Sequence, residues 1–225
     1  MESVFADVFH TDAALVRTTF VNGTHALATV LLGILRPGDE LIYATGDPYD
    51  TLQTVIGITN YTPGNGSLKD YGVTFKKVDL LPDGSIDIEG VKSAITDKTK
   101  MITAQRATGY SWRKAISVEE IGMLMDAIHS VNPDIVKMVD NSYGEFLDTK
   151  EPTDVGADVM ASSLIKNDPD GSGIRAFWQE IRQMFDEKHP ECVLISEWSY
   201  PSKAIAAGFH IDFLIHFNLP AYTKL

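Results

Sequence analysis

The stretch Ile135-Val-Lys-Met-Val-Asp140, followed at once by Asn141, decides how this sequence folds. A short apolar run of this kind is typical of a strand that is buried on both faces of a parallel sheet. Asp140 would stand at the carboxyl end of that strand, where open α/β sheets bind their ligands, and its burial needs a cation or a donor. An aspartate that merely caps the next turn is the alternative interpretation.

Working outward, short β-branched runs alternate with longer amphipathic ones as far as residue 167. The other predicted strands span residues 14–16, 40–44, 74–78, 100–104 and 159–162. The predicted helices span residues 24–35, 88–95 and 118–131. The last helix follows a capping box, Ser117-Val-Glu-Glu120. Strands separated by helices indicate an α/β fold with a mostly parallel sheet and flanking helices.

Composition narrows the function classes. The chain has 225 residues, 44% of them hydrophobic, which is typical of a soluble globular protein. Its formal net charge of -12 would repel a phosphate backbone, so nucleic-acid binding is not expected. The longest apolar run is too short for a membrane span, and a lone cysteine together with the absence of a recognisable secretory signal predicts a cytoplasmic protein.

Two further sites could carry chemistry. Gly23 and Thr24 open the first predicted helix, where free backbone N–H groups and the helix dipole suit a phosphate, although Asn-Gly is also an ordinary turn. Lys166 ends the apolar run that begins at Met160, and a lysine in an apolar pocket can form a Schiff base with an aldehyde. A solvated surface lysine is the alternative.

A phosphate cradle, a strand-end aspartate and a strand-end lysine on one sheet together suggest pyridoxal 5'-phosphate as the cofactor. Tyr49, which follows the second predicted strand, could stack on the cofactor ring, or it could be a half-exposed loop residue. No metal site is predicted.

Residues 1–167 closely resemble the aluminium-resistance or methionine gamma-lyase-like family of fold-type I pyridoxal-phosphate enzymes. The stretches that carry the resemblance are Ala14-Leu-Val-Arg17, Asn22-Gly-Thr-His-Ala26, Leu35-Arg-Pro-Gly-Asp-Glu40, Pro48-Tyr-Asp-Thr-Leu52, Gly109-Tyr-Ser-Trp-Arg113, Val139-Asp-Asn141, Tyr143-Gly-Glu145 and Ser163-Leu-Ile-Lys-Asn167. So many matching stretches in the same order make the resemblance specific to this family.

The resemblance implies a role for each matching residue. Lys166 would form the Schiff base with the cofactor, and Asp140 would pair with its pyridine nitrogen. Gly23, Thr24 and Ser163 would hold the phosphate, and Tyr49 would stack on the ring. The implied reaction is β- or γ-elimination from a sulfur-containing amino acid, with a small-molecule substrate. Arg106 and Arg113 are candidates for the substrate carboxylate on charge alone.

The tail follows a different pattern. From about residue 160 the sequence resembles the barrel of the alpha-amylase-type glycoside hydrolases. The stretches that carry this resemblance are Leu164-Ile-Lys-Asn-Asp-Pro-Asp170, Phe177-Trp-Gln-Glu-Ile-Arg182, Leu194-Ile-Ser-Glu-Trp198 and Ala207-Gly-Phe-His-Ile-Asp-Phe213. Residues 174–188 read as a helix and 192–196 as a strand, with Glu197 at its carboxyl end. The resemblance assigns Glu197 the general acid/base role, but the family's nucleophilic aspartate would fall at Val159.

We therefore expect an apparent chimera of two parts. Residues 1–167 would form an incomplete transferase-like large domain, and residues 168–225 a fragment of a (β/α)8 barrel. The favoured function is a carbon–sulfur lyase that requires pyridoxal phosphate. The alternatives are a glycoside hydrolase fragment acting on alpha-glucans and a non-catalytic chimeric or truncated product. If the chain folds, its exposed sheet edge and apolar faces predict a homo-oligomer.

Overall fold

The computed structural model describes residues 2–17, 19–163, 174–190, 195–197, 205–206, 209 and 211–213. The chain divides into two compact units, residues 2–164 and the remainder from residue 165 onward. Within the described residues, no helix is long and apolar enough to cross a membrane.

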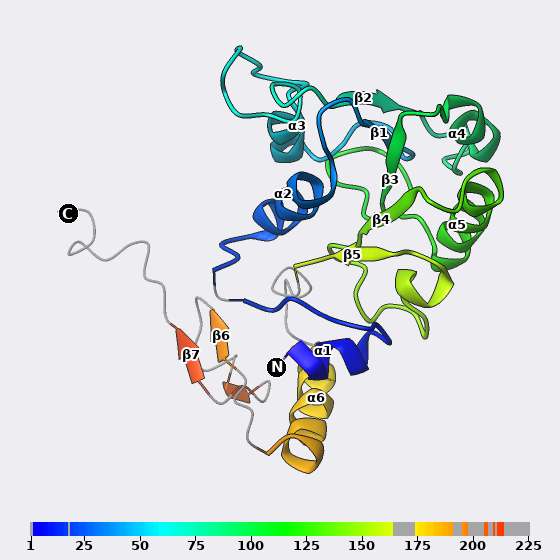
Figure 1. Ribbon diagram of the computed structural model, residues 1–225. Coiled ribbons are helices and arrows are strands. Elements are labelled where there is room, and N and C mark those ends of the chain that lie inside the picture. The colour runs from blue at the N-terminus through cyan, green and yellow to red at the C-terminus, as the bar shows by residue number, and fades with distance from the viewer. Residues whose placement is uncertain are drawn as a thin grey trace. The chain divides into compact units, whose positions relative to one another are not determined.

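The larger unit is built on a five-stranded sheet in which every pairing is parallel. Its strands lie side by side in the order β2-β1-β3-β4-β5 (Figure 1). They are β1 (Glu40–Tyr43), β2 (Thr74–Lys77), β3 (Thr99–Gln105), β4 (Val136–Asp140) and β5 (Val159–Ala161). The α/β class with a mostly parallel sheet is therefore confirmed, and Asp140 is the last residue of a central strand.

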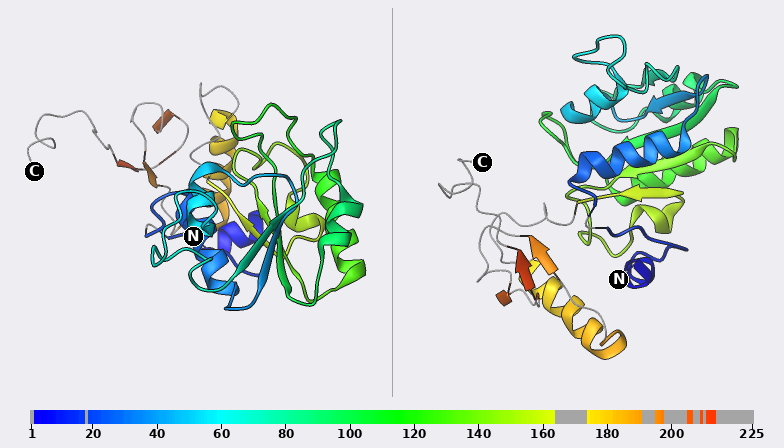
Figure 2. Two further views of the ribbon diagram at one scale, coloured as in Figure 1. Left: turned by 90° about the horizontal axis from the view of Figure 1, so that it is seen from above. Right: turned by 60° about the vertical axis from the view of Figure 1, so that its left-hand side comes forward.

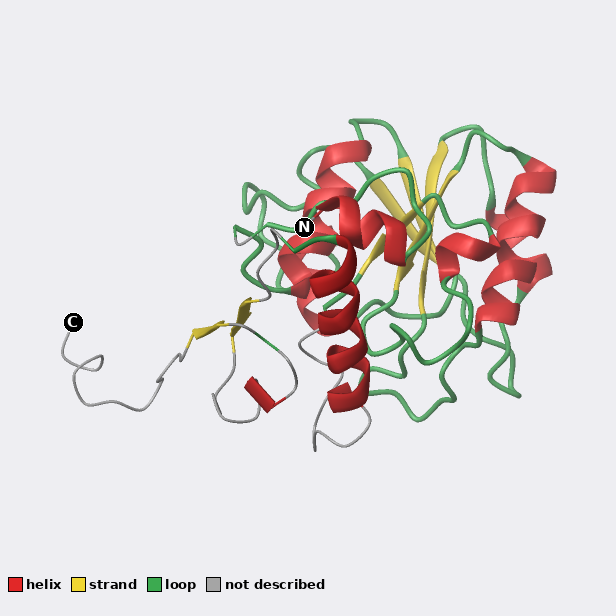
Figure 3. Cartoon of the chain, turned by 90° about the horizontal axis from the view of Figure 1, so that it is seen from below, coloured by secondary structure: helices red, strands yellow, loops and turns green. Residues whose placement is uncertain are grey.

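Helices cover both faces of this sheet, as the view in Figure 3 shows. The helices of this unit are α1 (Glu2–Val8), α2 (Gly23–Ile34), α3 (Asp50–Ile56), α4 (Ile88–Ala94) and α5 (Val118–Val131), with a 3-10 turn η1 (Pro152–Val155). One core lies between the sheet and α4 and α5, and the other lies between the sheet and α2 and α3. Side chains alternate between the two faces along each strand, so both cores draw on the same strands.

The capping box predicted for α5 is confirmed. The Ser117 hydroxyl accepts from the backbone N–H of Glu120 at 3.1 Å, and the Glu120 carboxylate accepts from the Ser117 N–H at 3.3 Å. Four buried apolar residues, Ile121, Leu124, Met125 and Ile128, then line one face of the helix. The local start signal and the helical spacing therefore agree, and both ends of the helix lie where the sequence predicts.

The strand predicted at residues 14–16 is wrong. The backbone N–H of Val16 donates to the Glu2 carboxylate at 3.1 Å, and Leu15 is 69% exposed. A strand needs a neighbouring strand to pair with and a buried face for its apolar side chains. Residues 14–16 pair with no strand of the described residues, and Leu15 points to solvent. Helices α1 and α3 were not predicted; each is seven residues long, a length at which the helical spacing of apolar residues is a weak signal.

The smaller unit contains α6 (Ile174–Lys188), β6 (Ile195–Glu197) and β7 (Ile211–Phe213), and β6 pairs in parallel with β7. Figure 2 shows these elements in two further orientations. Helix α6 has the predicted bounds. Glu197 is the last residue of β6, whereas the strand was predicted to end one residue earlier. A parallel pair and one helix do not define a (β/α)8 barrel, so that assignment stays a prediction.

Candidate functional site

The candidate site lies at the carboxyl edge of the sheet, with Asp140 near its centre. Asp140 is 4% exposed, and its Oδ1 accepts from the backbone N–H of Ser142 at 3.1 Å. The alternation of the strand places its side chain on the same face as Met138, which belongs to the core under α2 and α3. A buried carboxylate is therefore held where a ligand on that face could reach it.

Two helices begin at this same edge. The first turn of α2 is capped by Asn22, whose side-chain oxygen accepts from the His25 N–H at 2.9 Å. The hydroxyls of Thr24 and Thr51 lie 2.6 Å apart and join the start of α2 to the start of α3. Gly23, also predicted from the sequence, is buried in the first turn. This pair of helix starts brings backbone N–H groups and hydroxyls together, which are groups that suit an anion.

Tyr49, the residue before α3, is fixed through both its backbone and its side chain. Its backbone N–H donates to Oε1 of Gln105 at 3.1 Å. Its ring stacks on that of Tyr110 with the centroids 5.6 Å apart, and the two hydroxyls lie 3.3 Å from each other. The hydrogen bond with Tyr110 raises the pKa of Tyr49 to about 12, and partial burial adds to the shift. Tyr49 therefore stays protonated at neutral pH.

Gln105, at the end of β3, also fixes the loop that carries Tyr110. Its Nε2 donates to the Ala107 carbonyl at 3.1 Å. Gly109 in this loop has φ +59°, and a Cβ there would lie 3.0 Å from the Gln105 amide nitrogen. Arg113 donates to the carbonyls of Gln105 and Ala107 at 3.0 and 2.5 Å. The half-buried Arg113 thus braces its own loop, and burial lowers its pKa.

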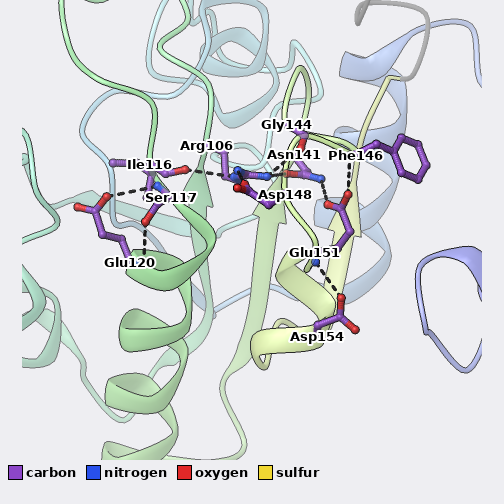
Figure 4. Close-up of polar contacts among 10 residues, drawn as sticks. All are labelled: Arg106, Ile116, Ser117, Glu120, Asn141, Gly144, Phe146, Asp148, Glu151 and Asp154. Carbon is purple, nitrogen blue, oxygen red and sulfur yellow. Dashed lines mark hydrogen bonds and ion pairs between the residues drawn. The ribbon is translucent and has the colours of Figure 1, made fainter. Parts of the chain in front are cut away.

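Arg106 has a different environment, although only six residues separate it from Arg113. It is 5% exposed, and its guanidinium donates to four acceptors (Figure 4). These are the Ile116 carbonyl at 3.1 Å, Asn141 Oδ1 and the Gly144 carbonyl at 2.9 Å each, and Asp148 Oδ2 at 2.7 Å. The geometry assigns Arg106 to the interior, so the hypothesis that it binds a substrate carboxylate is replaced by a role in holding the loop after β4.

That loop is also anchored by buried carboxylates. Glu151 accepts from Asn141 Nδ2 at 2.8 Å and from the Phe146 N–H at 2.6 Å. Burial raises the pKa of Glu151, while these two hydrogen bonds oppose the shift. Tyr143 and Phe146 adopt positive φ angles of 67° and 61°, a conformation that few non-glycine residues take. The network around Arg106 and Glu151 holds the backbone that follows Asp140 in this strained form.

Two residues expected to hold a cofactor lie at or beyond the edge of what the structure describes. The backbone N–H of Ser163 donates to Glu145 Oε1 at 2.9 Å. Lys166 lies outside the described residues, and so does the side chain of Glu197. No group of three metal-ligating side chains occurs in the described part of the chain. Sequence reasoning missed Gln105, although its position at the end of an apolar run was a usable signal.

This arrangement defines a class of protein: an α/β fold with a parallel sheet flanked by helices and a candidate site at the carboxyl edge of the sheet. The same fold occurs in the pyridoxal-5'-phosphate-dependent protein YhfS of Escherichia coli, with a TM-score of 0.52 at 20% identity. That structure matches 71% of this chain and 37% of its own. The methionine gamma-lyase family model matches residues 1–176, and the chain belongs to that family.

Closer relatives agree with this assignment. The uncharacterized protein YnbB of Bacillus subtilis is 47% identical over 167 residues, which is 74% of this chain and 39% of that protein. A carbon-sulfur lyase involved in aluminium resistance from Clostridium novyi has a TM-score of 0.68 at 46% identity, covering 71% of this chain and 38% of its own. A Listeria monocytogenes protein, provisionally described as a cystathionine beta-lyase involved in aluminium resistance, has a TM-score of 0.72 at 48% identity. The match covers 77% of this chain and 43% of that protein. The chain spans about two fifths of the length of these relatives.

Proposed function

We propose that this chain binds pyridoxal 5'-phosphate at the carboxyl edge of its sheet and takes part in β- or γ-elimination from a sulfur-containing amino acid. The observation that carries the proposal is the buried Asp140, at a strand end on the sheet face that α2 covers, in a chain of the methionine gamma-lyase family. A carbon-sulfur lyase among the relatives supports the same reaction class.

The residues present fit the cofactor by their chemistry. Asp140 offers a buried carboxylate to a protonated pyridine nitrogen, an ion pair that a low-dielectric site strengthens. Gly23 and Thr24 offer a backbone N–H and a hydroxyl to the phosphate, and Ser163 is proposed to add a third donor. Tyr49 offers an aromatic face, and its position is fixed by Gln105.

When bound, pyridoxal phosphate supplies an electron sink that stabilises negative charge at the substrate α-carbon. Lys166 is proposed to hold the cofactor through its amine, and, once the substrate amine has taken its place, the freed lysine amine would take the α-proton. For β-elimination, the carbon–sulfur bond breaks next, and the sulfur leaves with the electron pair as a thiolate. The Tyr49 hydroxyl is protonated at neutral pH and can donate a proton to that sulfur. Arg113 remains the proposed partner of the substrate carboxylate.

The test is a titration of the purified chain with pyridoxal phosphate, followed by visible absorbance. We expect a new band in the wild type that Lys166→Ala does not form, because the amine that attaches the cofactor is gone. Lys98→Ala is the matched control, since Lys98 is exposed and lies before β3 at the opposite edge of the sheet. An equal band in wild type and Lys166→Ala would overturn the assignment.

A second function is proposed for the smaller unit, that of an alpha-amylase-type glycoside hydrolase fragment in a chimeric chain. It is favoured by α6 leading to β6, which ends at Glu197, and by the parallel pairing of β6 with β7. A carboxylate at the carboxyl end of a parallel strand suits the general acid/base of a glycosidase. Binding or cleavage of maltooligosaccharides that is lost in Glu197→Gln would support it, and unchanged behaviour in that variant would refute it.

A further inference from the structure

Tyr43, the last residue of β1, buries a hydroxyl without satisfying it. The residue is 0% exposed, and its hydroxyl finds no hydrogen-bond partner among the described residues. Buried hydroxyls in folded proteins are nearly always hydrogen bonded, because leaving one unpaired costs its desolvation free energy. An exception inside a well-packed core therefore points to a hydrogen bond that forms only in another state of the chain.

The register of the sheet places Tyr43 under the candidate site. Tyr43 pairs with Thr103, and Gln105 pairs with Asp140. Because Thr103 and Gln105 are two residues apart on β3, all four side chains point to the same face of the sheet. This is the face of α2 and α3, since Tyr43 belongs to the core beneath them. The long phenol side chain can carry its hydroxyl beyond its own level in the sheet.

The electrostatic surroundings of the hydroxyl agree with this placement. Burial raises the pKa of Tyr43 well above its usual value, and the negative charge of Asp140 raises it further. The positive charge of Arg113 acts in the opposite direction. The phenol is therefore neutral, retains its proton as a donor, and lies within the influence of both charged groups at the carboxyl edge.

We propose that Tyr43 is a positioning residue of the cofactor site, whose hydroxyl in the loaded chain donates to the Asp140 carboxylate, directly or through one ordered water. This would hold the carboxylate toward the pyridine nitrogen. The inference rests on the proposed cofactor. Thr103 provides the contrast, because its hydroxyl is equally buried and also has no partner within the described residues, yet its short side chain stays at the level of Met138.

The experiment compares Tyr43→Phe with Thr103→Val in two measurements. Urea unfolding of the cofactor-free chain reports the cost of each unpaired hydroxyl, and we expect both variants to unfold at a higher urea concentration than wild type. Equilibrium titration with pyridoxal phosphate, read by absorbance, reports the cofactor site. Tyr43→Phe should raise the dissociation constant roughly tenfold or more, because a hydrogen bond to a charged group is lost. Thr103→Val should leave it unchanged.

A merely structural role would show as lower stability in Tyr43→Phe with no weakening of cofactor binding. Equal dissociation constants for wild type and Tyr43→Phe would overturn the role of Tyr43 alone. A wild type that shows no absorbance change at all would overturn the proposed function, and with it this inference. Weaker binding in both variants would also contradict it, because Thr103 lies away from the proposed hydrogen bond.

Discussion

Arg106 and Arg113 lie on either side of one short loop, and the structure uses them in opposite ways. The guanidinium of Arg106 is buried and donates to four acceptors from two segments of the chain, Ile116 before α5 and the loop after β4. Arg113 is only half-buried and contacts backbone carbonyls of its own loop and of Gln105. The Arg106 region is a closed scaffold, whereas Tyr49 and Arg113 are partly exposed and contact Gln105, which pairs with Asp140. Equal charge in the sequence therefore does not mean equal function.

The largest expected effect comes from breaking the closed region. Arg106→Met should lower the free energy of unfolding by roughly 3–5 kcal/mol, because it leaves Asp148 unpaired and buried carbonyl and amide oxygens without a donor. Urea unfolding measures this loss. Arg17→Met is the matched control, since Arg17 is 59% exposed in an ion pair with Glu2 and should cost less than about 1 kcal/mol. Similar losses in the two variants would contradict a scaffold role for Arg106.

A moderate effect is expected at the start of α5, directly after the Ile116 carbonyl that Arg106 contacts. Ser117→Ala removes one half of the capping box and should cost about 1 kcal/mol. Ser130→Ala serves as the control, because Ser130 is exposed in the last turn and its hydroxyl donates to the Ala127 carbonyl of its own helix. Thermal or urea unfolding can compare them. No difference between the variants would mean that the cap does not stabilise this region.

The pH dependence of stability should reveal Glu151. Its pKa is raised by burial, so the folded chain binds this proton more readily than the unfolded chain does. The stabilising contribution is therefore present below pH 4.5 and is lost as the pH rises through the raised pKa. When the urea midpoint is plotted against pH, the contribution of Glu151 appears as a fall in stability above pH 4.5, and Glu151→Gln should remove that fall. A slope that survives the substitution would assign the effect to another group.

The smallest effect on stability belongs to the open region. Tyr110→Phe should leave the unfolding free energy nearly unchanged, because both tyrosines retain solvent exposure, but it removes the hydrogen bond that raises the pKa of Tyr49 to about 12. In the wild type, this contribution to stability is present below pH 10 and lost as the pH rises through about 12. Carbon-13 NMR of the Tyr49 ring, assigned with Tyr49→Phe, should show its pKa moving toward 10 in Tyr110→Phe. An unmoved pKa would mean that the hydroxyl pair does not form in solution.

The same contrast explains what the sequence could predict. Strand β4 and helix α5 follow from continuous local patterns, and so does the position of Asp140 at a strand end. The role of Arg106 could not be predicted, because its partners at Asn141 and Asp148 lie 35 and 42 residues away and only the folded sheet brings them together. The failed strand at residues 14–16 has a similar cause, since Glu2 takes the backbone donor of Val16.

The central claim is that the open edge of the sheet, and not the Arg106 network, receives the cofactor. The most direct measurement is reduction of the chain with borohydride in the presence of pyridoxal phosphate, followed by peptide mapping of the labelled lysine. We predict that the label is found on Lys166 in the wild type and in Arg113→Met, and that Asp140→Ala reduces it strongly. A label spread over exposed lysines such as Lys98, or one that is indifferent to Asp140, would contradict the account.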